Sequence, residues 1–221
     1  MKNLLKLTWS ITMIGIVAVL TGCDLNNNNT PSVYYTDFVT THIDIDESLF
    51  FEQVLRNDLG SVMLYPYPTI KGKLYEGQRV LLQYYVKEEK PDNNKEVEIM
   101  NIYSVRHDTI IDAHPDTIAA YPDDPVKVNT ISRTGNYINL DISIEYFNKS
   151  HGLNLFSNPM QAPSDTIDVI LRHNNNNDAH GYWATAYASF YIPNLARYRA
   201  MRVYANTPND PLGYFIIKIK D

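Results

Sequence analysis

The stretch YINLDISIEY, residues 137–146, alternates strictly between apolar and polar side chains. The apolar positions are Ile138, Leu140, Ile142, Ile144 and Tyr146, and the polar positions are Asn139, Asp141, Ser143 and Glu145. A period of two is typical of a β-strand that buries one face and leaves the other in water. Gly135 and Asn136 precede it and predict a tight turn after a strand over residues 126–133. The sequence therefore predicts an antiparallel hairpin here.

The same period of two recurs along most of the chain. Further strands are predicted over residues 96–104, 166–172 and 214–220. In residues 181–192 neither face is fully polar, which predicts a long central strand that is partly covered on both sides. Residues 194–201 begin with an asparagine cap followed by good helix formers, and they predict a short helix. The predicted fold class is all-β.

The first 22 residues have the layout of a signal peptide. Two lysines precede an apolar run of 14 residues, residues 7–20, whereas a helix that crosses a membrane needs about 20. The run ends in Leu20-Thr21-Gly22-Cys23, which resembles the lipobox of bacterial lipoproteins, where the cysteine is lipidated and becomes the first residue. Cys23 is therefore predicted to be the lipid attachment site. An ordinary secretory peptide with an incidental cysteine is the alternative.

Residues 23–32 are polar and rich in asparagine, which predicts a lipidated tether without a fold of its own. Cys23 is the only cysteine in the sequence, so the mature chain has no thiol pair for a disulfide. We expect the protein to contact a membrane through its N-terminal lipid. The favoured location is the cell envelope, on the outer membrane and facing the periplasm.

The composition argues against several classes of protein. Lys and Arg number 19 against 25 Asp and Glu, a net charge of -6, whereas nucleic-acid binding needs clustered positive charge. The glycines never form G-x-G, and the chain has neither G-x-S-x-G nor H-E-x-x-H, the marks of dinucleotide binders and of common hydrolases. We therefore expect a protein that binds no nucleic acid, needs no cofactor and is not an enzyme.

The proline-rich segment DAHPDTIAAYPDDP, residues 112–125, separates two strand-rich halves. This composition predicts a linker between a first domain over residues 33–112 and a second over residues 113–221. A single sandwich with a long loop is the alternative, because all-β domains can exceed 200 residues.

Several stretches together resemble the NigD-like lipoproteins over nearly the whole mature length. They are the lipobox, YYTDFVT at 34–40, NDLGSVMLYP at 57–66, GQRVLLQYYV at 77–86, TGNYINLDISI at 134–144, His151-Gly152-Leu153 and LRHNNNND at 171–178. The resemblance implies an N-terminal OB-type β-barrel followed by a C-terminal antiparallel β-sandwich. The family takes its name from a bacteriocin-associated gene cluster, and this implies a binding or accessory role in the envelope rather than a known reaction.

Tyr65 and Tyr67 lie in the sequence YPYP, residues 65–68. Two aromatic rings held between prolines can stack on a sugar ring or dock a protein, and OB barrels bind oligosaccharides on a strand face and its loops. We treat both tyrosines as candidate ligand contacts, for a protein or a glycan partner. The alternative is that the rings pack against their own barrel.

Asp-Thr-Ile occurs three times, at residues 108–110, 116–118 and 165–167. It resembles a short acceptor motif for O-glycosylation in exported proteins of anaerobes that carry such lipoproteins. Thr109, Thr117 and Thr166 are therefore candidate glycosylation sites. The alternative is that Asp-Thr serves as an ordinary pairing at a turn or strand edge.

Two clusters of histidine and aspartate are candidate metal sites. They are His107, Asp108, Asp112, His114 and Asp116, and separately His173, Asp178 and His180. Imidazole with carboxylate suits zinc, but both clusters fall where we expect turns, and polar side chains there commonly satisfy backbone groups. We therefore expect no metal site.

Overall fold

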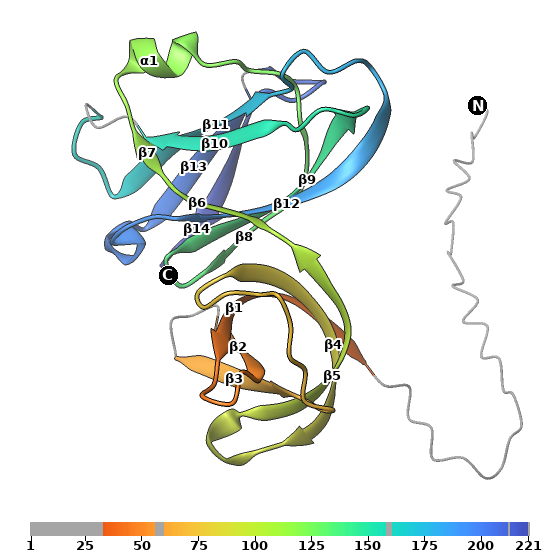
Figure 1. Ribbon diagram of the computed structural model, residues 1–221. Coiled ribbons are helices and arrows are strands. Elements are labelled where there is room, and N and C mark those ends of the chain that lie inside the picture. The colour runs from red at the N-terminus through yellow and green to blue at the C-terminus, as the bar shows by residue number, and fades with distance from the viewer. Residues whose placement is uncertain (1–32, 56–59, 158–160, 212, 221) are drawn as a thin grey trace, which may run out of the picture. The chain divides into compact units, whose positions relative to one another are not determined.

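The computed structural model describes residues 33–55, 60–157, 161–211 and 213–220, which all belong to one structural unit. The described chain is built mainly from strands, as Figure 1 shows. The prediction of an all-β fold is confirmed. The predicted signal peptide and tether, with Cys23, lie outside the described residues.

The first part of the chain closes into a β-barrel. Its strands are β1 (Tyr34–Ile43), β2 (Leu49–Val54), β3 (Ser61–Pro66), β4 (Arg79–Glu89) and β5 (Lys95–Ser104), with the 3-10 turn η1 (Pro91–Asn93) between the last two. They neighbour one another in the order β1-β2-β3-β5-β4, and β1 pairs with β4 to close the barrel. Five strands in a small closed barrel are the architecture of an OB fold. The expected OB-type barrel is confirmed.

The second part forms a sandwich of two sheets. Its strands are β6 (Arg106–Thr109), β7 (Ile111–Asp112), β8 (Lys127–Thr134), β9 (Tyr137–Tyr146), β10 (Gly152–Ser157), β11 (Thr166–Asn174), β12 (Tyr182–Tyr191), β13 (Ala200–Ala205) and β14 (Tyr214–Lys218), and it carries the helix α1 (Pro115–Ala120) and the 3-10 turn η2 (Leu195–Arg197). One described sheet has the order β14-β13-β11-β10-β7 and the other β6-β12-β9-β8. The expected β-sandwich is confirmed.

The sandwich also contains parallel strand pairs, which the expectation of an antiparallel sandwich did not include. Strand β11 pairs with β13 in parallel, as do β12 with β6 and β10 with β7. The reason lies in the chain path: β12, which connects β11 to β13, belongs to the opposite sheet. After this crossover, β13 returns to the first sheet in the direction of β11.

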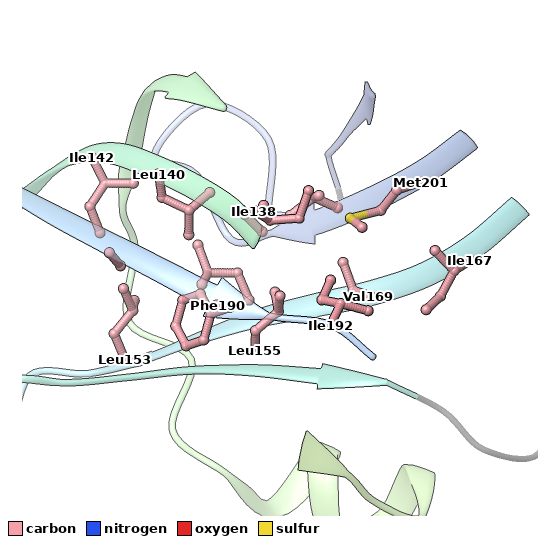
Figure 2. Packing of buried hydrophobic residues seen from close by; sticks show 14 of the residues in the cluster. Ile138, Leu140, Ile142, Leu153, Leu155, Ile167, Val169, Phe190, Ile192 and Met201 are labelled. Atoms are coloured by element: carbon pink, nitrogen blue, oxygen red, sulfur yellow. The ribbon is translucent and has the colours of Figure 1, made fainter. Parts of the chain in front are cut away.

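The core of the sandwich follows from the alternation seen in the sequence. Figure 2 shows Ile138, Leu140 and Ile142 of β9 facing Leu153 and Leu155 of β10, with Phe190 between them. All six side chains are buried, and each contributes about 2 kcal/mol through removal from water. The barrel has a separate core that includes Val39, Phe51, Leu64, Val80, Leu82 and Val97.

The passage from barrel to sandwich differs from the predicted linker at residues 112–125. Strands β6 and β7, within residues 106–112, already pair with strands of the sandwich. The segment that follows is fixed to the sandwich, because the Asp124 amide donates to the His173 carbonyl over 2.9 Å. We therefore place the border at Val105. The prolines of residues 112–125 lie in a surface connection that contains a short helix, not in a joint between domains.

The helix predicted over residues 194–201 is wrong. The structure has the 3-10 turn η2 at Leu195–Arg197, and strand β13 begins at Ala200. Asn194 adopts the left-handed conformation, with φ 55°, and its side chain makes no capping hydrogen bond. Burial of Leu195 and pairing of β13 with β11 outweigh the local helix propensity.

Arg79 joins the barrel to the sandwich. Its guanidinium donates to Thr40 in the barrel and to Thr134, Asn139 and Ser189 in the sandwich, over 3.0 to 3.3 Å. The side chain is fully buried and lies 4.5 Å from the centre of the Tyr137 ring. Burial lowers the pKa of Arg79 to about 10, although Tyr137 and Glu52 favour the charged form. The residue therefore remains a cation at neutral pH.

This joint corrects the expectation of a wet polar face over residues 137–146 at Asn139, whereas Asp141, Ser143 and Glu145 are partly exposed. Asn139 is buried because the barrel covers it through Arg79. The same contact explains why both faces of β12 are partly apolar, as the sequence predicts. Ser189 is fully buried, and the Tyr187 ring lies 6.3 Å from Phe38 and 5.8 Å from Tyr103, both in the barrel.

Candidate functional site

Three aromatic rings form a row across the outside of the barrel. His42 of β1 is paired directly with Phe50 of β2, and their ring centres are 5.2 Å apart. Tyr65 of β3 continues the row, with its ring 5.7 Å from that of Phe50. The planes are nearly parallel, at 23° and 19°. We call these residues the ring row.

The ring row follows from the period of two in the three strands. Phe51 and Leu64, next to Phe50 and Tyr65, fill the barrel core, so Phe50 and Tyr65 point outward. Tyr65 is 40% exposed. The hypothesis that it presents its ring at the surface agrees with this position, and its ligand stays a prediction.

Two carboxylates flank the ring row. His42 Nδ1 lies 2.7 Å from Glu76 Oε1, and His42 Nε2 lies 3.4 Å from Glu52 Oε2. The amide of Ile43 also donates to Glu76, over 2.8 Å. This amide and the His42 ring lower the pKa of Glu76. The site thus combines flat apolar ring faces with carboxylate acceptors.

Tyr67, the second predicted contact, does not extend the ring row. Tyr67 is 57% exposed, and its ring centre lies 5.9 Å from the Lys87 ammonium group. Its amide donates to the Val97 carbonyl over 2.7 Å, so the backbone of Tyr67 is held next to β5. Tyr65 and Tyr67 therefore offer separate aromatic surfaces.

The structure separates the first histidine cluster. His107 packs against Tyr137 at 5.6 Å, and burial first and Arg79 second lower the pKa of His107. His114 caps α1 by accepting from the Asp116 amide, whereas Asp112 accepts from Ser157. Across the described ranges, no group of three or more His, Cys, Asp or Glu is arranged to hold a metal ion.

The second cluster gains a further member, His151, which the sequence analysis does not group with His173, Asp178 and His180. His151 contacts both His173 and Asp178, whereas His180 is exposed and pairs with Glu145. The alternation could have located this contact. His173 follows Leu171 on the buried face of β11 and is paired with Leu153, two residues after His151. His151 is therefore its diagonal neighbour on the same face.

The three candidate threonines differ in exposure. Thr109, in the edge strand β6, and Thr117, in α1, are both exposed. Thr166 is half-buried at the start of β11, and its hydroxyl lies 3.4 Å from Asp165 Oδ1. Thr109 and Thr117 are thus accessible to a modifying enzyme, and glycosylation stays a prediction at all three.

Together, an OB-type barrel and a β-sandwich joined by a buried arginine define a two-part all-β protein. Residues 109–207 match the NigD-like C-terminal beta sandwich domain. The resemblance to the NigD-like family is therefore confirmed. No curated protein matches the sequence.

Solved structures share the fold across both parts. A protein of unknown function from Bacteroides vulgatus has a TM-score of 0.70 and 19% identity, covering 84% of this chain and 90% of its own. A candidate lipoprotein from Bacteroides fragilis has a TM-score of 0.64 and 11% identity, covering 85% and 99%. A NigD-like immunity protein from Bacteroides caccae has a TM-score of 0.57 and 16% identity, covering 83% and 96%. At these identities the likeness establishes the fold.

The part of the chain that the structure describes contains no helix long and apolar enough to cross a membrane.

Proposed function

We propose that this chain is a non-enzymatic, lipid-anchored binding protein of the cell envelope, and that the ring row binds its macromolecular partner. The ring row is the observation that carries the proposal. Stacked rings with an exposed Tyr65 at one end give a flat surface that is already ordered before binding. Such a surface binds with little loss of side-chain freedom.

The sequence and a solved structure of the same fold support a role in the cell envelope. The lipobox at residues 20–23 predicts attachment through Cys23. One solved structure of the same fold carries the name of a NigD-like immunity protein. We infer an accessory or protective role in competition between bacteria, exerted from the outer membrane towards the periplasm and without nucleic acid.

Partner capture from native membranes tests the binding surface. The bait is residues 33–221, which form one structural unit, as the unchanged chain, as Tyr65→Ala and as Tyr214→Ala. Tyr214 is a matched control, because it is 53% exposed but lies on the sandwich. A partner that is retained by the unchanged chain and by Tyr214→Ala and lost with Tyr65→Ala supports the proposal. Equal retention by all three baits contradicts it.

The anchor and the location have separate tests. Cys23→Ala should move the protein out of the membrane fraction, because the acyl chains proposed to be attached to Cys23 anchor the protein in the bilayer. Protease treatment of intact cells should leave a periplasm-facing protein undigested. Membrane retention of the Cys23→Ala protein, or its digestion on intact cells, would contradict the anchor and the orientation, respectively.

A glycan is the second candidate partner, and the carboxylates beside the ring row favour it. The C–H face of a sugar packs on an aromatic ring, while Glu52 and Glu76 can accept hydrogen bonds from its hydroxyl groups. A glycan array with residues 33–221 tests this, beside Tyr65→Ala, Tyr67→Ala and the Tyr214→Ala control. Binding that disappears with Tyr65→Ala alone identifies the ring row, and loss with Tyr67→Ala places the sugar on the neighbouring ring.

A further inference from the structure

A continuous line of polar groups crosses one end of the sandwich. His173 Nδ1 lies 3.3 Å from the Asp124 carbonyl oxygen, and His173 Nε2 lies 2.9 Å from His151 Nδ1. His151 Nε2 lies 3.2 Å from Asp178 Oδ2. The side chains of His151 and Asp178 are only 5% and 1% exposed. Water therefore has little access to replace a missing hydrogen bond here.

The number of protons in this line follows from the atoms at its ends. A carbonyl oxygen and a carboxylate only accept, so the ring nitrogens facing Asp124 and Asp178 must both carry hydrogen. The contact between the rings needs one further hydrogen, because two lone pairs cannot bond. Three hydrogen bonds thus need three ring hydrogens, whereas two neutral imidazoles supply two.

We propose that His151 and His173 hold one extra proton in the folded protein, and that this singly charged pair, bound to Asp178, clamps the loop at residues 147–150 to the loop at residues 175–178. In this arrangement His173 is neutral and donates through Nδ1 to Asp124. His151 is the imidazolium and donates through both nitrogens. The positive charge lies against the Asp178 carboxylate.

The surroundings of each group favour this distribution of charge. Burial, and then the neighbouring His151, lower the pKa of His173, which suits its role as the neutral acceptor. Burial alone would raise the pKa of Asp178. The amide of Phe147, the His151 ring and the amides of Lys149 and Asn148 outweigh this effect and lower the pKa instead. Asp178 is therefore an anion at neutral pH, and its contact with His151 favours positive charge on that ring.

The clamp reaches both loops through Asp178 and its neighbours. The Asp178 carboxylate accepts from the amide of Phe147 over 2.8 Å and from that of Asn148 over 3.2 Å. Lys149 Nζ donates to the Asn177 carbonyl over 2.6 Å. Asn148, Ser150 and His151 also line a hollow of about 570 Å³. The protonation state of the pair therefore acts on the residues at the edge of this hollow.

Other charged and titratable groups face the same end from each neighbouring element. Arg106 of β6, Tyr146 of β9 and Tyr187 of β12 line the hollow. Arg106 is 3.7 Å from Asp108, which offsets its charge. The Asp124 carboxylate accepts from the Asn175 amide over 2.8 Å. Asp178 contacts the histidine pair through its carboxylate, whereas Asp124 contacts it through its carbonyl oxygen, and the charge of Asp124 partly offsets the lowering of the His173 pKa.

The clamp should hold at intermediate pH and weaken on both sides. Loss of the extra proton at high pH leaves two ring hydrogens, so one of the three hydrogen bonds is lost. The contact with Asp124 is the longest and goes first, and the positive charge that His151 places against the Asp178 carboxylate disappears with the proton. A second extra proton at low pH places two N–H groups against each other across 2.9 Å. Both changes loosen the hold on residues 147–150.

Nitrogen NMR of the histidine rings in residues 33–221 tests the proton count directly. At pH 6.5 we expect the imidazolium pattern for His151 and the neutral Nδ1–H pattern for His173. Asp178→Asn should abolish the imidazolium at this pH, whereas the exposed control His180→Gln should not. Two neutral rings in the unchanged protein at pH 6.5, or an imidazolium that survives Asp178→Asn, would overturn the proposal.

Two further measurements test the proposal if Asp178→Asn folds poorly. One is the pKa of His173 in a His151 variant, and the other is amide hydrogen exchange in the unchanged protein. His151→Gln removes the neighbouring positive charge, so the pKa of His173 should rise, and an unchanged pKa argues against a charged pair. In the unchanged protein, the protection factors of the Phe147 and Asn148 amides should be about tenfold lower at pH 9 than at pH 6.5. Equal protection at the two pH values would show that the proton does not hold the loops.

Discussion

The Arg79 guanidinium of the barrel donates to the Asn139 side chain of the sandwich over 3.1 Å, and both residues are buried. Asn139 also accepts from Ser189 over 2.8 Å and donates to Thr134 over 2.9 Å. A buried polar network of this kind is stable only while each member keeps its partners. The two parts of the protein therefore share one cooperative contact.

Replacement of Arg79 should destabilise the whole unit. Arg79→Met removes one buried donor from Asn139 and one from Ser189, and we expect a loss of about 3 kcal/mol in the free energy of unfolding. Arg79→Lys should also destabilise, because an ammonium group cannot reproduce the planar fork. Urea unfolding measures both, with Arg197→Met as a surface control. A change within about 0.5 kcal/mol, the usual spread of surface substitutions, would argue that the joint adds nothing.

Gly181 should be intolerant of a side chain for a steric reason. A Cβ there would overlap the carbonyl oxygen of Tyr146 on the neighbouring strand β9. Gly181→Ala must push the two strands apart, and we expect a loss of about 2 kcal/mol in thermal or urea unfolding. Gly72→Ala is the matched control, because its Cβ would meet only Leu49 Cδ1 at an ordinary 3.4 Å. Equal stability of the two variants would contradict the prediction.

Alternation of apolar and polar neighbours along the chain predicts the all-β class and most strand positions, and it also predicts the hairpin at Gly135. The role of Arg79 could not be predicted, since its partners Asn139 and Ser189 are 60 and 110 residues away. For the same reason the burial of Asn139, on the expected wet face of residues 137–146, could not be predicted. The one indication in the sequence was that neither face of residues 181–192 is fully polar, as expected for a strand covered on both sides.

The candidate sites divide in the same way. Tyr65 was identified from its own neighbourhood, but His42 and Phe50 joined it only through pairing of β1, β2 and β3. His151 was missed because it precedes its strand and its partners are 22 and 27 residues away. The prediction of a helix at residues 194–201 is wrong because it rests on local helix propensity, whereas pairing of β13 with β11 determines the structure there.

Asp178 should contribute to loss of stability in acid. Its folded-state pKa is lowered below the ordinary value of 3.8, so its contribution is complete well above that value and is lost as pH falls through the folded pKa. Asp178→Asn should lower stability at pH 7 and reduce its further loss on acidification. Chemical unfolding between pH 2 and pH 7 measures this. Parallel pH curves for the two proteins would contradict the prediction.

Glycosylation, if the Asp-Thr-Ile motif is an acceptor, should occur at exposed Thr109 and Thr117 rather than at half-buried Thr166. Intact-mass measurement of protein from its native host checks this. Thr109→Ala and Thr117→Ala should each remove one glycan mass, while Thr166→Ala should leave the mass shift unchanged apart from the substitution. A single unmodified species would end the idea.

Phe50 and Phe51 are adjacent in β2 but should respond differently to replacement. Phe51 is fully buried in the barrel core, so Phe51→Ala should cost about 3 to 5 kcal/mol. Phe50 lies on the outer face and stacks between His42 and Tyr65, so Phe50→Ala should cost about 1 kcal/mol from lost stacking. Urea unfolding separates the two. If Phe50→Ala is as damaging as Phe51→Ala, the ring row is part of the structural core, and its proposed role as a binding surface loses its support.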